Sequence, residues 1–306
     1  MDLLDKSIIL ELMYNCRASC QDLAEKFSSS RGVVRKRIEK LQDIGVIENF
    51  TAWYSLAMID ANLVLSHITT NQPTEKDEIL SNLEQNPMIH AVIPTVSHDF
   101  VVHAEAIGLD GLSNLGVSIR KLRGVDQAEL HPIQFNRGKK FEMKKIHLRV
   151  MSALFLNSRL SGAEIARRTA LSPRSVRRAL DEIVTGQGII FGIARNPGAE
   201  SGLHFYVKTT WDDRKTEAGA IIKQIQQIFP EATWESYVSA CSPTLFTRFF
   251  VGYAKDAERI SSAISGLEGV ESIENLVLYP ARVTSSLSRE RLKDDILNAG
   301  FSFCPP

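Results

Sequence analysis

The sequence predicts an α+β protein in which two winged helix-turn-helix modules each precede a ferredoxin-like α/β sandwich domain of order βαββαβ. Three observations predict this fold class. The chain repeats itself at a constant offset, each copy begins with three short amphipathic helices, and each continues with alternating strand and helix patterns. We expect the first module at 1–60, its α/β domain at 61–138, the second module at 139–200, and the second α/β domain with a C-terminal helix at 201–306.

The repeat is clearest near the start of each copy. Asn15-Cys-Arg17-Ala-Ser19 reappears as Asn157-Ser-Arg159-Leu-Ser161, and the match continues without a gap through three apolar helical segments. One residue is inserted after Ile183, so that Gly45-Val-Ile47 corresponds to Gly188-Ile-Ile190. A constant offset over this length indicates a tandem duplication.

The third helix of the first copy combines one apolar face with a dense basic face. Ser30 is suited to cap it, and Val34, Ile38 and Leu41 recur at the spacing of one buried helical face. The remaining positions are mostly basic: Arg31, Arg35, Lys36, Arg37 and Lys40.

The second copy repeats this arrangement. Ser172-Pro173 is an N-cap followed by proline at the first helical position, and Val176, Leu180 and Ile183 form the apolar face. The solvent side carries Arg174, Ser175, Arg177 and Arg178. Beyond Gly188, the runs at 189–195 and 203–208 predict a hairpin wing.

A basic helix in this position suits the major groove of DNA, where Arg and Lys reach guanine or phosphate oxygens. Lys+Arg and Asp+Glu both number 36, so any DNA-binding charge must be local. Alternatively, the basic side chains only face solvent, and the modules serve as a protein–protein scaffold that does not bind DNA. Two copies with the same basic helix favour double-stranded DNA as the partner. The predicted contacts are Ser30, Arg31, Arg35, Lys36, Arg37, Lys40, Ser172, Arg174, Ser175, Arg177 and Arg178.

After each module the apolar pattern predicts strand, helix, two strands, helix and strand. In the first half these segments are 63–68, 75–83, 89–96, 100–107, 112–122 and 128–133. In the second half they are 205–209, 218–229, 233–239, 248–253, 257–267 and 272–279. A last helix is expected at 289–298, capped by Ser288 and stopped by Gly300.

The composition predicts neither a metal site, a cofactor nor a catalytic set. The cysteines Cys16, Cys20, Cys241 and Cys304 are too few and too scattered for a disulfide framework, and no second Cys or His pair gives Cys16 and Cys20 zinc spacing. No apolar run is long enough to cross a bilayer, and the acidic N-terminus is unlike a signal peptide, which predicts a cytoplasmic protein without a membrane partner.

The sequence resembles the Lrp/AsnC family of feast/famine transcription regulators. The resemblance covers nearly the whole chain, as two successive copies of the family's pattern. The family pattern is met by Asp2, Asp5, Asn15, Arg17, Ser19, Leu23, Ala24, Ser30, Val34, Arg37, Ile38, Leu41, Gly45 and Ile47. Two positions depart from it: Ser29 replaces a leucine, and Ala179 stands in the second copy where the family has arginine.

The resemblance implies α/β domains that pair between subunits and bind amino-acid effectors. It places the effector at the turn before the third strand, here at Ser97, His98 and Asp99 in the first copy and at Ser242 and Thr244 in the second. Neither turn keeps the family's glycine. Because the chain carries two such domains, we expect them to pair within one chain as a pseudo-dimer, with further homo-oligomers through outer edges.

One enzymatic alternative stays open. A similar two-module fold is used by sirohaem decarboxylases, and Val96-Ser-His98-Asp-Phe100 faintly resembles their histidine-containing segment. The rest of that motif is missing, and the second copy has no equivalent histidine. We therefore expect a regulator and no enzymatic activity.

Overall fold

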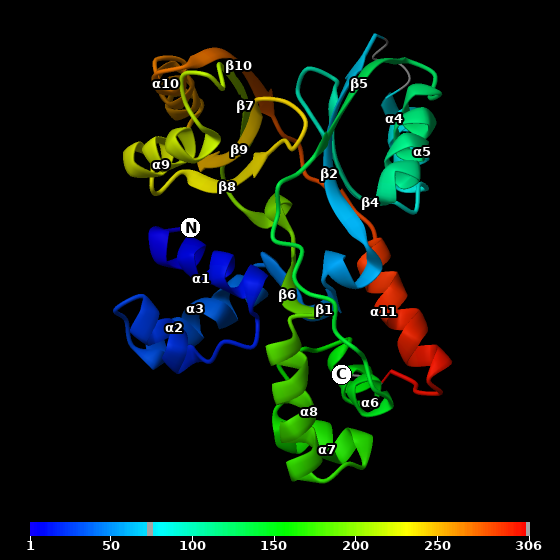
Figure 1. Cartoon of the computed structure of the whole chain (residues 1–306). Coiled ribbons are helices and arrows are strands. Elements are labelled where there is room, and N and C mark those ends of the chain that lie inside the picture. Colours follow the sequence, from blue (N-terminus) through cyan, green and yellow to red (C-terminus); the bar gives the residue numbers. More distant parts are fainter. Residues whose placement is uncertain (72–75, 304–306) are drawn as a thin grey trace. The chain divides into compact units, whose positions relative to one another are not determined.

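The computed structural model describes residues 1–71 and 76–303, so Glu75, where a helix was expected to begin, and Cys304 lie outside the described residues. It divides into two compact units, whose elements are labelled in Figure 1. Unit 1 comprises Met1–Ala61, Arg137–Glu200 and the segment from Ser285, and unit 2 comprises Asn62–Asn136 and Ser201–Thr284.

Unit 1 contains both helix-turn-helix modules. Its first half is α1 (Leu3–Tyr14), α2 (Cys20–Lys26), α3 (Arg31–Asp43), β1 (Ile47–Tyr54) and the 3-10 turn η1 (Leu56–Ile59). Its second half is α6 (Lys145–Leu154), α7 (Gly162–Thr169), α8 (Pro173–Gly186), β6 (Ile189–Arg195), η3 (Pro197–Ala199) and, later in the chain, α11 (Leu287–Asn298).

Serine caps start the second and third helix of each module. The side chains of Ser19, Ser30, Ser161 and Ser172 each accept a hydrogen bond from the backbone N–H three residues on. On α3 the buried residues are Val34, Ile38 and Leu41, as expected; on α8 they are Val176, Ala179 and Ile183, whereas Leu180 is only half-buried.

The predicted hairpin wing is wrong. Strand β6 does not pair with the strand at 203–211 that follows it; it pairs antiparallel with β1 of the other module, from Ile47 opposite Arg195 to Tyr54 opposite Ile189. The two strands form a separate two-stranded sheet shared by both modules. The backbone groups along one edge of β1 are thereby paired with those along one edge of β6.

Helix α11 was expected with the second α/β domain and belongs to unit 1 instead. Its cap is Ser286, not Ser288, which is buried in the first turn. Arg289 donates to the side chain of Thr51 and to the carbonyl of Ala52, and Tyr54 donates to Asp295 at 2.9 Å. These contacts hold the C-terminal helix against strand β1.

Unit 2 contains two ferredoxin-like domains. The first has β2 (Ala61–Thr70), α4 (Lys76–Glu84), β3 (Ile89–Pro94), β4 (Phe100–Ile107), α5 (Gly108–Arg120) and β5 (Val125–Pro132). The second has β7 (Leu203–Trp211), α9 (Ala218–Ile228), β8 (Thr233–Val238), β9 (Thr244–Val251), α10 (Ala254–Ser265) and β10 (Val270–Val277). Both show the expected βαββαβ order; the third strand of the second domain begins at Thr244 rather than at 248.

The sheets have the strand orders β11-β3-β4-β2-β5, where β11 is Arg282–Val283, and β10-β7-β9-β8. In each domain two helices cover one face of the sheet, as Figure 1 shows for α4 and α5 and for α9 and α10. One apolar core lies under each helical layer, with Ile68 and Phe100 in the first and Phe205 and Phe249 in the second.

The other faces of the two sheets pack on each other. A third core joins Leu65 and Val101 of the first domain to Tyr206, Phe246 and Leu276 of the second. Two symmetry-related bridges flank it, between Thr95 and Leu278 and between Ile133 and Ser239. The expected intrachain pairing of the two α/β domains is therefore confirmed, because each sheet buries its uncovered apolar face against its duplicate.

Candidate nucleic-acid interface

The third helices α3 and α8 each expose a row of cations opposite their buried face. Arg35 is joined to Glu39 at 3.6 Å, and Arg178, whose side chain is 80 % exposed, donates to Glu182 at 2.8 Å. Across residues 1–71 and 76–303, no acid lies within ion-pair distance of four other exposed cations of these helices, Arg31, Lys36, Arg174 and Arg177. These four side chains are available for an external anion.

Two predicted contacts on α3 are engaged inside the first module. Arg37 donates to Asp2 at 2.5 Å and to Asp5 at 2.9 Å, and Lys40 lies 3.9 Å from Asp5. Asp2 and Asp5 also form the capping box of α1. The family's Asp-x-x-Asp and Arg positions therefore join the start of the first helix to the third.

The second module has the same connection with the charges exchanged. At the positions of Asp2 and Asp5 it carries Lys144 and His147, and at the position of Lys40 it carries Glu182. Lys144 lies 3.2 Å from Glu182, and His147 Nε2 lies 2.9 Å from the same oxygen. In the second module the acid, Glu182, stands on the third helix, and the basic residues Lys144 and His147 stand at the start of the first helix. Residue 179 on the third helix therefore has no acid to pair with, so an arginine is not needed there and alanine is compatible with the module.

Replacing Glu182 with glutamine tests this exchanged pair. Hydrogen bonds from Arg178, His147 and Lys144 lower the pKa of Glu182 from 4.5 to about 2. A lowered pKa contributes stability that is present above pH 4.5 and is lost as the pH falls toward 2. We expect E182Q to melt below the wild type at pH 7, and the difference in Tm to shrink as the pH falls from 4.5 to 2.

The control for E182Q is D181N, which removes an equal charge from an exposed neighbour on the same helix. Thermal unfolding followed by circular dichroism gives both values. Equal losses in the two variants would contradict a specific role for Glu182.

The Asn-x-Arg-x-Ser motif joins the two modules, which sequence reasoning missed. Arg17 donates to the carbonyls of Ser158 at 2.5 Å and Leu160 at 3.3 Å, and Arg159 donates to the carbonyl of Ala18 at 3.2 Å. Each guanidinium also lies over a ring of the other module, Phe191 and Phe50 respectively. The signal was present in the repeat, because both arginines recur at the same offset.

Neighbouring backbone groups repeat this reciprocal pattern. The N–H of Cys16 donates to Phe191 O at 2.7 Å, and that of Ser158 donates to Phe50 O at 3.0 Å. Burial raises the pKa of the Cys16 thiol to about 12, which keeps it protonated at neutral pH. Two equivalent sets of hydrogen bonds thus join the modules, and they hold α3 and α8 within one unit.

The first expected effector turn is closed by its own side chains. Ser97 donates to Asp99 at 3.0 Å, and Asp99 accepts from the N–H of Thr70 at 3.1 Å. His98 is exposed and has a φ of 70°, a left-handed conformation at the tip of the turn. The histidine that suggested a decarboxylase thus lies on an exposed turn.

The second expected turn contacts the first domain. Ser242 donates to Thr244 at 3.0 Å and lies 3.5 Å from His131 Nδ1, while Ser239 lies 3.2 Å from the same nitrogen. Thr244 is buried. The two turns therefore supply hydroxyl and carboxylate groups at the paired interface of unit 2.

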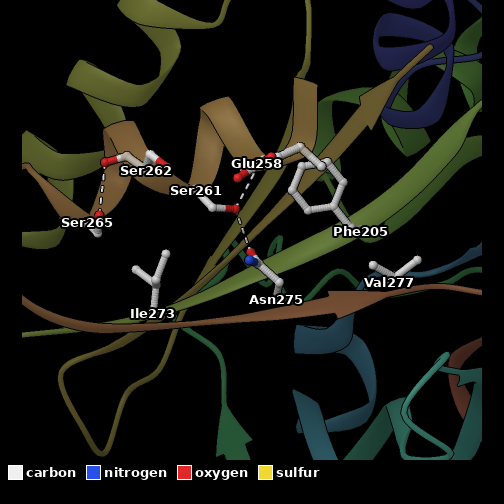
Figure 2. Close-up of a pocket in the computed structure, with 9 residues that line it drawn as sticks. Phe205, Glu258, Ser261, Ser262, Ser265, Ile273, Asn275 and Val277 are labelled. Atoms are coloured by element: carbon white, nitrogen blue, oxygen red, sulfur yellow. Dashed lines mark hydrogen bonds between the residues drawn. The ribbon is translucent and has the colours of Figure 1, made fainter. Parts of the chain in front are cut away.

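A pocket of about 510 Å³ lies elsewhere, between α10 and β10 (Figure 2). Ser261 points into it and donates to Asn275 at 2.8 Å, with Ile273 and Val277 from β10 forming its apolar side. None of the predicted effector residues lines it. In the described part of the chain, no group of three or more His, Cys, Asp or Glu residues is arranged to hold a metal ion, and no described helix is both long and apolar enough to cross a membrane.

Comparison with known proteins agrees with the duplicated modules. A family described as winged helix-turn-helix DNA-binding matches residues 1–48 and again 143–182. The HTH-type transcriptional regulator LysM of Saccharolobus solfataricus is 29 % identical over 122 residues, which are 40 % of this chain and 84 % of LysM. An uncharacterized HTH-type transcriptional regulator of Pyrococcus furiosus, PF1734, is 25 % identical over 132 residues, 43 % of this chain and 89 % of the relative.

A solved structure of a protein of similar length aligns with almost the whole chain. The sirohaem decarboxylase NirDL, in complex with an iron-uroporphyrin III analogue, aligns with a TM-score of 0.58 and 13 % identity over 97 % of this chain and 100 % of NirDL. This likeness shows a shared fold. The relatives with higher identity are regulators about half as long as this chain, as a duplication requires. By its motifs and its relatives, the chain carries two winged helix-turn-helix modules and is similar to a tandem duplication of such HTH-type regulators.

Proposed function

We propose that this protein is a transcription regulator that binds double-stranded DNA by inserting α3 and α8 into the major groove. The observation that carries the proposal is the set of exposed cations on both helices that have no acidic partner in the described residues: Arg31, Lys36, Arg174 and Arg177. Arginine in this setting donates to guanine O6 and N7 or to phosphate. Arg35 and Arg178 are exposed beside them and add positive charge.

The two helices present different side chains at matched positions. Gly32 and Lys36 of α3 correspond to Arg174 and Arg178 of α8, and Arg31 corresponds to Pro173. Site symmetry follows protein symmetry, so two unlike modules in one chain favour an asymmetric site. This property separates the chain from a homodimer of single-module subunits, which favours a palindrome.

Selection of bound sequences from random duplex DNA tests both parts of the proposal. We expect enrichment of a site with two unlike halves, bound with an affinity that falls as salt rises. Enrichment of a perfect palindrome would mean that two chains supply matching modules. Failure to enrich any sequence, together with binding that is insensitive to salt, would leave the scaffold alternative.

An amino-acid effector at the turns of unit 2 is the finer part of the proposal. Ser97, Asp99, Ser242 and Thr244 provide the hydroxyl and carboxylate groups that such a ligand would contact. Repeating the selection with and without a panel of amino acids tests it, because an effector alters the affinity for the selected site. The same samples, run on a sizing column, report any homo-oligomer.

The fold of NirDL supports a second candidate, an enzyme acting on a tetrapyrrole. Purified protein incubated with sirohaem and desalted distinguishes the two functions. A retained visible absorption band would favour the enzyme, and a colourless protein that shifts duplex DNA would favour the regulator.

A further inference from the structure

The interface between the two ferredoxin-like domains contains two pairs of charged groups at equivalent positions. His67 of β2 lies opposite Glu129 of β5 in the first sheet, and Lys208 of β7 lies opposite Glu274 of β10 in the second. Each base also faces the acid of the other domain. Lys208 Nζ lies 2.7 Å from Glu129, and His67 Nδ1 lies 3.8 Å from Glu274.

The two cross-domain contacts are not equally formed. Lys208 makes a full ion pair with Glu129 and lies 3.4 Å from Glu274. The side chain of His67 is 1 % exposed, and neither ring nitrogen has a hydrogen-bond partner among residues 1–71 and 76–303. Both nitrogens nevertheless face carboxylates, Nδ1 toward Glu274 and Nε2 toward Asp99 at 4.0 Å. A buried polar group without a partner is costly, which calls for an explanation.

We propose that His67 is a proton-operated switch in the pairing of the two domains. When the ring takes up a proton, both nitrogens become donors, and they close onto Glu274 of the second domain and Asp99 of the turn at 95–99. Lys208 already makes the equivalent contact, with Glu129 of the first domain, in the observed structure. The duplication makes this possible, because a symmetric homodimer would carry the same residue at both positions.

In the described part of the chain, the charged groups around His67 come from one turn and three strands. Asp99 lies in the turn before β4, Glu274 on β10, Lys208 on β7 and Glu129 on β5; His131, the partner of Glu129 at 3.3 Å, lies one step further. Burial lowers the pKa of His67, against the raising effect of Glu274. The ring is therefore neutral in the observed geometry at neutral pH.

Closure changes this balance. Two charge-assisted hydrogen bonds favour the protonated ring, so the closed interface binds the proton more tightly than the observed one. A state that binds a proton more tightly gains population as the pH falls. Acidification thus tightens the domain pairing and the turn at 95–99 together, whether or not the protein binds DNA.

Hydrogen exchange of the full chain measures this tightening directly. The N–H of Val96 donates to Val277 O at 3.0 Å, and the N–H of Tyr279 donates to Pro94 O at 2.8 Å, so both amides exchange only when the two domains separate locally. After correction for intrinsic exchange, we expect their protection to rise between pH 7.5 and 5.5. Each unit of pKa difference for His67 between the closed and the observed interface corresponds to about a tenfold change.

Three variants make the test specific. H67Q stays neutral and should keep the pH 7.5 protection at both pH values. H67K copies the residue at the equivalent position and should be protected at both. H98N removes an exposed histidine from the same turn, where its φ of 70° suits asparagine, and should behave as the wild type.

The proposal is overturned if wild type gains no protection, or if H67Q gains as much as wild type. It is also overturned if H67K remains as unprotected at pH 7.5 as H67Q. Because the readout is exchange within unit 2, these outcomes are independent of DNA binding.

Discussion

Replacing Arg174 and Arg177 together with alanine is expected to weaken binding to the selected duplex by about 1 to 3 kcal/mol for each side chain that reaches a base edge. Both guanidinium groups are exposed on α8 and lack an acidic partner in the described residues. Alanine is the best helix former, so α8 is retained. The double variant R31A/K36A makes the same test on α3.

The salt dependence of binding separates the two kinds of contact. A phosphate contact that is lost lowers the slope of log K against log salt by about 1, whereas a lost base contact relaxes sequence preference. Fluorescence anisotropy at several salt concentrations gives both. We expect R178A to lose less than R177A, because Glu182 already holds Arg178 at 2.8 Å.

The control is K121A/K223A, which removes two exposed lysines from the helical faces of unit 2. It carries the same change in net charge and should bind DNA as the wild type does. If R174A/R177A and R31A/K36A both retained wild-type affinity and salt slope, the assignment of α3 and α8 as recognition helices would be rejected.

Replacing Arg17 with alanine is expected to lower the free energy of unfolding by about 3 kcal/mol, since two charge-assisted hydrogen bonds are lost and two part-buried carbonyls lose their donor. Arg159 makes one such bond, at 3.2 Å, so R159A should cost about 1 to 2 kcal/mol. The ring contacts with Phe191 and Phe50 are lost as well. Urea denaturation followed by circular dichroism measures both.

Hydrogen exchange at single amides distinguishes a loss of contact between the modules from a general loss of stability. The amides of Cys16 and Ser158 donate across the two modules, and their hydrogen exchange should accelerate in R17A. R35A is the matched control, because Arg35 is exposed and its pair with Glu39 contributes little. A stability of R17A within about 0.5 kcal/mol of the wild type, as is usual for a surface substitution, would contradict the role of the motif.

Most elements could be predicted because their signals are local. The spacing of Val34, Ile38 and Leu41, the serine caps and the alternating strands report on contacts within one helix turn or one strand pair. The repeat then supplied a second copy of every signal, which is why both βαββαβ domains and their pairing were expected. Element ends differ from the predicted ones, because β9 begins at Thr244 and the cap of the last helix is Ser286.

The partner of a strand and the partner of a charge are not local properties. Strand β6 carries the same residues whether it pairs with its chain neighbour or with β1, and the choice depends on which edge the folded modules bring together. For the same reason Arg37 looked like a DNA contact on the helix pattern alone, although Asp2 and Asp5 bind it from a helix 32 or more residues away.

The sequence by itself therefore determined the duplication, the type and order of the elements, and the presence of a basic face on each third helix. Tertiary structure alone decided which cations keep an external role, that Arg17 and Arg159 tie the modules together, and that His67 meets Glu274 across a domain interface. The physical reason is range. Helix and strand patterns follow from periodicity along the chain, whereas hydrogen bonds and ion pairs act over a few ångströms between groups that only folding brings together.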